Sequence, residues 1–174
     1  RLTVENARRH AWFCSGILYW MLDDCWPAAM GWSLLDYTGR HKGGAWALRH
    51  HAAPCTLTLE NGRAFVSNIL PTAVSATVSV QRVVLGGGAV SAVITQEASF
   101  VSGCTEVPFS ADTLQPDEVL VGTITAAQTV RTFYTDGCPL LTPCREAVQV
   151  NRSGQCLELS ADRYVHVVEL SRAE

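Results

Sequence analysis

Two tryptophans and two adjacent aspartates are the residues of this sequence best suited to contact a sugar. Trp20, Asp23, Asp24 and Trp26 lie within or directly after a continuously apolar run, Gly16–Leu22. The flat face of an indole ring stacks on the C–H face of a pyranose, and barrel enzymes present their functional groups where buried strands end. The cluster therefore predicts a carbohydrate site to which all four residues contribute.

The two aspartates are poorly placed to act together as general acid and base. Adjacent side chains of a strand point to opposite faces, so Asp23 and Asp24 would not meet at one glycosidic bond. A structural role is equally open for both, in which the carboxylates accept backbone N–H groups of the loop or pair with an arginine. For Trp26, contact with a ligand and packing at the rim of the pocket are both open.

A helix, a buried strand and a second helix are predicted to position this cluster. The first helix is expected over Thr3–Phe13, which begins with a suitable N-cap residue. Gly16–Leu22 is expected to form a strand buried on both faces, because the run is apolar throughout and does not alternate. The second helix is expected over His41–His51 and ends before Pro54. Residues 1–53 are therefore predicted to be a fragment of an α/β barrel that this chain is too short to complete.

After Pro54, apolar residues recur at every second position of the sequence. In Val74–Gln81, valine and alanine alternate with serine, threonine and glutamine, which is typical of a strand with one buried face. Turn sequences such as Asn61-Gly62 separate similar short runs. Residues 54–174 are therefore predicted to form an immunoglobulin-like antiparallel β-sandwich, which makes the fold class mainly β. The predicted strands are Cys55–Leu59, Ala64–Asn68, Val74–Gln81, Ala89–Thr95, Glu118–Ala126, Thr129–Thr135, Ala147–Val150, Gln155–Leu159 and Arg163–Leu170.

The composition and net charge of the chain limit the kinds of molecule that it is expected to bind. The chain has 174 residues, of which 48% are hydrophobic and 17% charged, as in an ordinary globular protein. Its net charge of −3 disfavours binding to nucleic acid. A membrane span needs about 20 consecutive apolar residues, and Asp23 interrupts the longest candidate. The five histidines and seven cysteines lack the grouping of a zinc site, so neither a metal nor another cofactor is predicted.

The cysteines indicate a reducing compartment. Their number is odd and their spacing is irregular, which argues against a complete disulfide framework and favours buried thiols in a cytoplasmic protein. A periplasmic or secreted location is the alternative, if a leader has been removed. Cys138 and Cys144 could still close a small loop.

Two segments resemble glycoside hydrolase family 2, and within it the β-mannosidase-like branch. They read Gly16-Ile-Leu-Tyr-Trp-Met-Leu-Asp-Asp-Cys-Trp-Pro27 and Trp32-Ser-Leu-Leu-Asp-Tyr-Thr-Gly-Arg-His-Lys42. The last barrel strand of that family carries a Gly-x-Leu-x-Trp-x-Leu-Asn-Asp-Cys-Trp-Pro pattern, followed by Trp-Ser-x-x-Asp-Tyr-x-Gly-x-x-Lys, the final barrel helix and β-sandwich domains. The resemblance covers residues 5–54 closely, and the remainder only in layout. It implies that residues 1–53 are the C-terminal end of a (β/α)8 catalytic barrel, which is incomplete here.

The resemblance implies a retaining glycosidase in which two glutamates about 5–5.5 Å apart act as acid/base and nucleophile. Both would come from earlier barrel strands, upstream of Arg1, so the chain is expected to lack catalytic residues and to be inactive alone. It also implies that Trp20, Trp26, Asp23 and Asp24 bind substrate in the intact parent. The family usually has asparagine where this chain has Asp23, and an aspartate cannot donate the amide hydrogen bond.

The resemblance further implies a carbohydrate substrate and the remainder of the barrel as partners. Since the chain does not begin with methionine, we expect it to be part of a longer polypeptide. A barrel strand without its neighbours would have to pack on the sandwich, form an oligomer through its exposed faces or stay disordered. The alternative is an autonomous β-sandwich module for carbohydrate binding or interdomain contact, with residues 1–53 as a docking segment.

Overall fold

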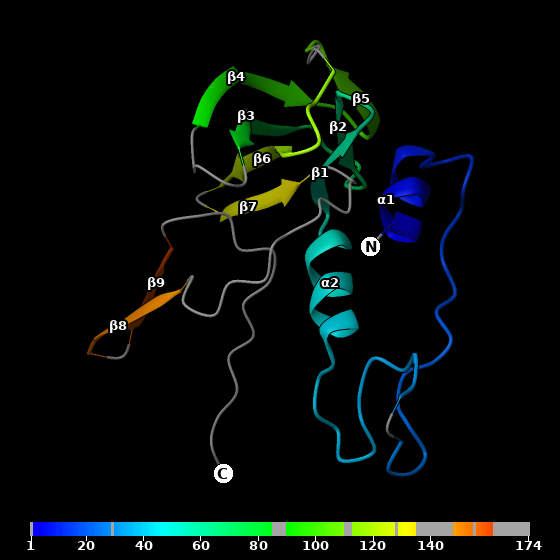
Figure 1. The fold of residues 1–174 in the computed structure, drawn as a ribbon. Coiled ribbons are helices and arrows are strands. Elements are labelled where there is room, and N and C mark those ends of the chain that lie inside the picture. Colours follow the sequence, from blue (N-terminus) through cyan, green and yellow to red (C-terminus); the bar gives the residue numbers. More distant parts are fainter. Residues whose placement is uncertain are drawn as a thin grey trace.

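The computed structural model describes residues 2–28, 30–84, 90–109, 113–127, 129–134, 148–154 and 156–161. Figure 1 shows two helices followed by a mainly β body, with no closed barrel in the described part of the chain. Helix α1 spans Leu2–Arg9, and helix α2 spans Gly43–His51. None of the helices in these residues is long and apolar enough to cross a membrane.

The strands form antiparallel sheets, as predicted. One sheet has the order β1-β2-β5 and the other the order β4-β3-β6-β7, while β8 and β9 pair in a separate hairpin (Figure 1). The confirmed class is therefore an antiparallel β-sandwich. The strands are β1 (Cys55–Glu60), β2 (Arg63–Asn68), β3 (Val74–Val84), β4 (Val90–Phe100), β5 (Gly103–Val107), β6 (Glu118–Ala126), β7 (Thr129–Tyr134), β8 (Gln149–Ser153) and β9 (Cys156–Ser160).

The core lies between the inner faces of the two sheets. The predicted alternation in β3 buries Ala76, Val78 and Val80 on one side, where they join leucines of β1 and β6. At Gly122 of β6 the sheets approach so closely that an added Cβ would lie 2.5 Å from Leu57 Cδ2. Aliphatic side chains of β1 thus occupy the space that a larger residue at this position would need.

Sequence and structure differ at β5. The short run Gly103–Val107 begins with glycine and carries polar residues, so its local pattern does not predict a strand. It becomes a strand because it pairs along the edge of β2, with Val107 opposite Ala64. The strand predicted at Arg163–Leu170 lies outside the described residues, as do Cys138 and Cys144.

The strand expected at Gly16–Leu22 does not form. The run is irregular, and Leu18, Trp20 and Leu22 are exposed, so it is neither buried nor packed on the sandwich. A strand requires a neighbour that accepts and donates its backbone hydrogen bonds. The described chain provides one only at the end of the run, where Leu34 and Leu35 donate to Leu22 O at 3.1 and 2.8 Å.

Helix α1 is held against the sandwich and against α2. Arg8 Nη2 donates to Ala53 O at 2.7 Å and to Pro54 O at 2.9 Å, at the point where α2 leads into β1. Ser67 Oγ of β2 donates to Arg8 O at 3.1 Å. These contacts give the first helix a defined position beside β1 and β2. The domain boundary predicted at 53/54 stays a prediction.

Ion pairs add to this junction. Arg9 Nη2 lies 2.7 Å from Glu60 Oε1 at the end of β1. Glu5 and His51 are both buried, with Glu5 Oε1 3.1 Å from His51 Nδ1, and they join α1 to the last residue of α2. Buried ionisable groups are tolerated when they are paired.

We expect Gly122→Ala to destabilise the sandwich, because the new methyl group overlaps Leu57 Cδ2 and lies 3.1 Å from Leu59 Cδ1. Overpacking of this kind lowers the free energy of unfolding by about 1–3 kcal/mol. Urea denaturation measures the change. The matched control is Gly16→Ala, whose added Cβ meets nothing within 4 Å. Equal stability of the two variants would contradict the close approach of the sheets.

Candidate functional site

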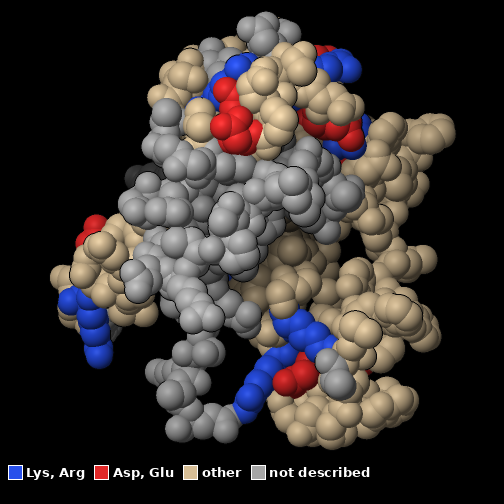
Figure 2. All heavy atoms as spheres, viewed as in Figure 1, with Lys and Arg blue, Asp and Glu red and all other residues tan. Residues whose placement is uncertain are grey.

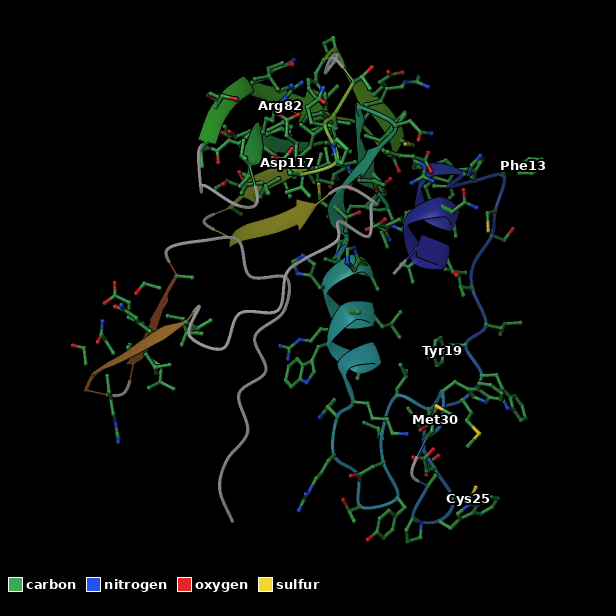
Figure 3. The ribbon with its side chains drawn as sticks, in the orientation of Figure 1. Phe13, Tyr19, Cys25, Met30, Arg82 and Asp117 are labelled. Atoms are coloured by element: carbon green, nitrogen blue, oxygen red, sulfur yellow. The ribbon has the colours of Figure 1, made fainter. Side chains whose placement is uncertain are left out.

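The predicted sugar-binding residues lie in a loop-rich lobe formed by residues 16–42. Figure 3 shows Tyr19, Cys25 and Met30 in this lobe, well apart from Arg82 and Asp117 of the sandwich. Three tryptophans are prominent on its surface, with exposed fractions of 80% for Trp20, 68% for Trp26 and 76% for Trp32. Most of the lobe's visible face in Figure 2 is uncharged. Indole rings thus stand at the surface, where they could stack on a ligand.

A pocket of about 390 Å³ opens in this lobe. Its size is in the range of small-molecule sites. The described residues that line it are Met21, Asp24, Cys25, Trp26, Ala28, Met30, Gly31 and Trp32. The structure therefore brings two of the four predicted residues, Asp24 and Trp26, to one pocket. Trp20 and Asp23 are exposed in the same lobe but do not line it.

Hydrogen bonds to backbone carbonyl groups shape the pocket. Asp24 N donates to Leu35 O at 3.2 Å, so the chain before the loop lies beside the chain after it. The hydroxyl group of Tyr19 donates to Trp32 O at 2.7 Å and holds the outgoing chain. The peptide bond between Trp20 and Met21 is cis.

Asp24 is the centre of a buried polar network. Its exposed fraction is 7%, and both carboxylate oxygens have a partner. Ser33 Oγ donates to Asp24 Oδ1 at 2.6 Å, and Lys42 Nζ donates to Asp24 Oδ2 at 2.5 Å. Lys42 Nζ also donates to Ser33 Oγ at 2.7 Å. Gly31 leaves room for this carboxylate, since an added Cβ would lie 2.8 Å from Asp24 Oδ1.

These hydrogen bonds decide the charge of Asp24. The bond from Lys42, and then that from Ser33, hold the pKa of the Asp24 carboxyl below its usual range. Asp24 is therefore ionised at neutral pH and is no general acid. Its contacts are those of a structural carboxylate, one of the two roles that the sequence left open. That Asp24 also contacts a sugar stays a prediction.

An aspartate turn returns the chain to this network. Asp36 Oδ1 accepts hydrogen bonds from Thr38 N at 2.8 Å, Thr38 Oγ1 at 2.6 Å and Arg40 N at 2.9 Å. Gly39 has a φ of +84°, a conformation that suits glycine. The bonds from Thr38, followed by that from Arg40, lower the pKa of Asp36. Beyond the turn, Lys42 N donates to Leu34 O at 2.8 Å, which brings Lys42 back beside Asp24.

The sequence did not single out Ser33 and Lys42 as site residues. A signal for Lys42 was available, because it is the only lysine in a chain with 13 lysines and arginines. Apart from Lys42 and the histidines, the basic residues of the chain are arginine, so the lysine at position 42 indicates a site that requires a compact ammonium group. Ser33 and Lys42 also occupy fixed positions of the Trp-Ser-x-x-Asp-Tyr-x-Gly-x-x-Lys pattern, which is the one signal that Ser33 carries.

Four glutamates of the described chain form ion pairs elsewhere. Glu60 pairs with Arg9, Glu106 with Arg63, Glu118 with Arg82 and Glu5 with His51. None of the described residues that line the pocket is a glutamate. Within the described part of the chain, the pocket is therefore formed without the pair of glutamates that retaining glycoside hydrolysis uses.

The fold is similar to that of solved carbohydrate-active enzymes. The β-D-mannosidase from Dictyoglomus thermophilum matches over 92% of this chain and 22% of its own, with a TM-score of 0.69 at 15% sequence identity. The exo-chitosanase from Amycolatopsis orientalis matches over 91% of this chain and 20% of its own, with a TM-score of 0.57 at 16% identity. The chain therefore spans about a fifth of the length of these structures. No family model and no curated protein sequence matches it.

We expect the Asp24 network to be lost in acid. Because the folded-state pKa of Asp24 is lowered, the network contributes stability above the unfolded value of about 3.9 and loses it as pH falls further. Tryptophan fluorescence should be constant from about pH 7 to 5 and change at lower pH.

The Asp24→Asn variant should lack this transition, whereas Asp36→Asn should keep it. Far-UV circular dichroism monitors whether the sandwich remains folded at each pH. An identical fluorescence titration in the wild type and in Asp24→Asn would show that Asp24 does not control the pocket.

Proposed function

We propose that the chain is the C-terminal part of a retaining, β-mannosidase-like glycoside hydrolase of family 2 and forms one wall of its sugar-binding pocket. The observation that carries the proposal is the aromatic pocket of about 390 Å³, built by the same residues that resemble the family's last barrel strand and its following segment. The similarity in fold to a β-D-mannosidase supports it.

In this proposal the tryptophans provide the sugar contacts. Trp20 and Trp26 present broad apolar faces to solvent, and stacking on a pyranose would cover them. Asp23 is exposed and could accept hydrogen bonds from hydroxyl groups of the sugar. Asp24 would contribute through the shape of the pocket as well as through any direct contact.

The catalytic glutamates would belong to another part of the polypeptide. The pocket side chains of this chain can bind and orient a sugar, but none has the paired-carboxylate arrangement that forms and hydrolyses a glycosyl-enzyme. We therefore infer that residues upstream of Arg1 supply the acid/base and the nucleophile, and that the chain alone does not hydrolyse glycosides.

The remainder of the barrel is the proposed partner of the exposed apolar residues. Leu18, Leu22 and Met30 are exposed in the same lobe as the tryptophans. Apolar surface of this extent is normally covered by a partner. Strands of the same barrel would cover it and would give Gly16–Leu22 the neighbours it lacks. In the isolated chain, a second copy could cover it in an oligomer.

A module for interdomain contact is the second candidate. The anchoring of α1 to the sandwich through Arg8 and Arg9 favours it, because these contacts hold the aromatic lobe on a β-sandwich with its own core. In that case the chain would position a partner domain without binding sugar. Calorimetric titration of the isolated chain with methyl β-D-mannoside and methyl β-D-glucosaminide measures whether the chain binds carbohydrate without the rest of the barrel.

The prediction for the enzyme concerns Trp20. In a polypeptide that also contains the upstream barrel, Trp20→Ala should lower kcat/KM for an aryl β-mannoside by about tenfold, the loss expected for one stacking contact. Trp46→Ala is the matched control, because Trp46 is an exposed tryptophan of α2 and lies outside the lobe of residues 16–42. Hydrolysis by the isolated chain, abolished by a single local substitution, would refute the proposal.

A further inference from the structure

Lys42 connects the pocket to helix α2. It is the N-cap residue of α2, yet its side chain makes no capping hydrogen bond. Instead the side chain contacts Asp24 and Ser33, and only 27% of it is exposed. A lysine at a helix N-terminus is unfavourable for the helix dipole. The lysine at position 42 is therefore explained by its contacts with Asp24 and Ser33, and not by a role in capping α2.

The network closes the loop that carries the pocket wall. Asp24 precedes the segment 25–32, Ser33 follows it directly, and Lys42 contacts both side chains. Trp26 and Trp32, which lie at the two ends of this segment, line the pocket together. The position of one tryptophan relative to the other therefore depends on the Asp24–Ser33–Lys42 contacts.

A serine beside a lysine could also indicate a nucleophile with its base. Two observations argue against that chemistry. Ser33 has an exposed fraction of only 3%, and its hydroxyl group donates to Asp24 Oδ1. Lys42 Nζ donates a hydrogen bond to Ser33 Oγ as well as to Asp24 Oδ2, so it does not accept the hydroxyl proton as a base would. The cluster is thus suited to hold a structure and not to attack a substrate.

We propose that Lys42, with Ser33 and Asp24, is a positioning residue for the sugar pocket. The three side chains hold residues 25–28 and 30–32 in the binding conformation before a sugar arrives, so that binding does not have to order the loop. Lysine serves here because its compact ammonium group contacts the carboxylate and the hydroxyl group at once. The inference rests on the proposed function for the identity of the ligand.

The chain offers a direct test because it contains a single lysine. Reductive methylation with ¹³C-formaldehyde labels only the Lys42 amine and the α-amino group, and NMR resolves the two. We expect Lys42 to react more slowly than the α-amino group in the wild type. In Asp24→Asn it should react about tenfold faster, the factor expected for loss of a hydrogen bond to a charged group.

Amide hydrogen exchange then reports on the pocket wall itself. Exchange of the Asp24 and Leu35 amides, which are hydrogen-bonded in the wild type, should rise in Lys42→Met and stay at the wild-type level in Arg152→Met, which removes an exposed cation from β8. Amide exchange in β3 and β6 verifies that the sandwich is folded in each variant. Equal labelling rates in the wild type and Asp24→Asn, or equal exchange of the Asp24 and Leu35 amides in the wild type and Lys42→Met, would overturn the positioning role.

Kinetics of the polypeptide with its upstream barrel separate positioning from folding. Lys42→Met should raise KM for an aryl β-mannoside by about tenfold, because the unbound loop is no longer ordered, and should lower kcat less. A purely structural defect would lower kcat through the fraction of folded enzyme and leave KM unchanged. Lys42→Arg should recover part of the loss, since it keeps the charge.

The two proposals fail in different ways. Lack of glycoside hydrolysis by the wild-type polypeptide would sink the proposed function, while slow Lys42 labelling and slow exchange of the loop amides would still support the positioning network. Unchanged labelling, amide exchange and KM in the variants would sink the network and leave an active enzyme.

Discussion

The guanidinium group of Arg8 joins the two parts of this structure. It belongs to α1 and donates to the carbonyls of Ala53 and Pro54 where α2 passes into β1, while the backbone carbonyl of Arg8 accepts a hydrogen bond from Ser67 Oγ of β2. Partial burial lowers the pKa of Arg8, and its Nε has no hydrogen-bond partner in the described chain. A half-buried cation of this kind is retained only where its other hydrogen bonds offset the cost of desolvation. These bonds set the direction in which α2, and with it the pocket lobe, leaves the sandwich.

The two parts are stabilised in different ways. The sandwich buries alternating aliphatic side chains from both sheets and has a closed core of its own. The lobe over residues 16–42 instead exposes its largest apolar side chains and holds its shape through a few polar contacts at Asp24 and Asp36. A polar framework with aromatic rings on its surface suits a binding wall. It also suits an element that a larger domain completes.

The period of two after Pro54 was sufficient to predict the sandwich. Eight of the nine predicted strands overlap an observed strand, namely β1–β4 and β6–β9. The predicted strand Glu118–Ala126 has the same first and last residue as β6. Strand β5 was missed because pairing with β2, rather than its own composition, makes it a strand. The apolar run at Gly16–Leu22 was predicted as a strand but has no neighbour to pair with over most of its length.

The sequence alone determined the class of the fold and the residue types at the site, because alternation, turn residues and aromatic clusters are local properties of a chain. Tertiary structure decided what each site residue does. Asp24 became a structural carboxylate because the Asp36 turn brings Lys42, 18 positions further along the chain, to its side. Asp24 and Trp26 share a pocket while Asp23 and Trp20 do not line it. Such distinctions depend on how a loop closes on itself, and no local pattern carries that information.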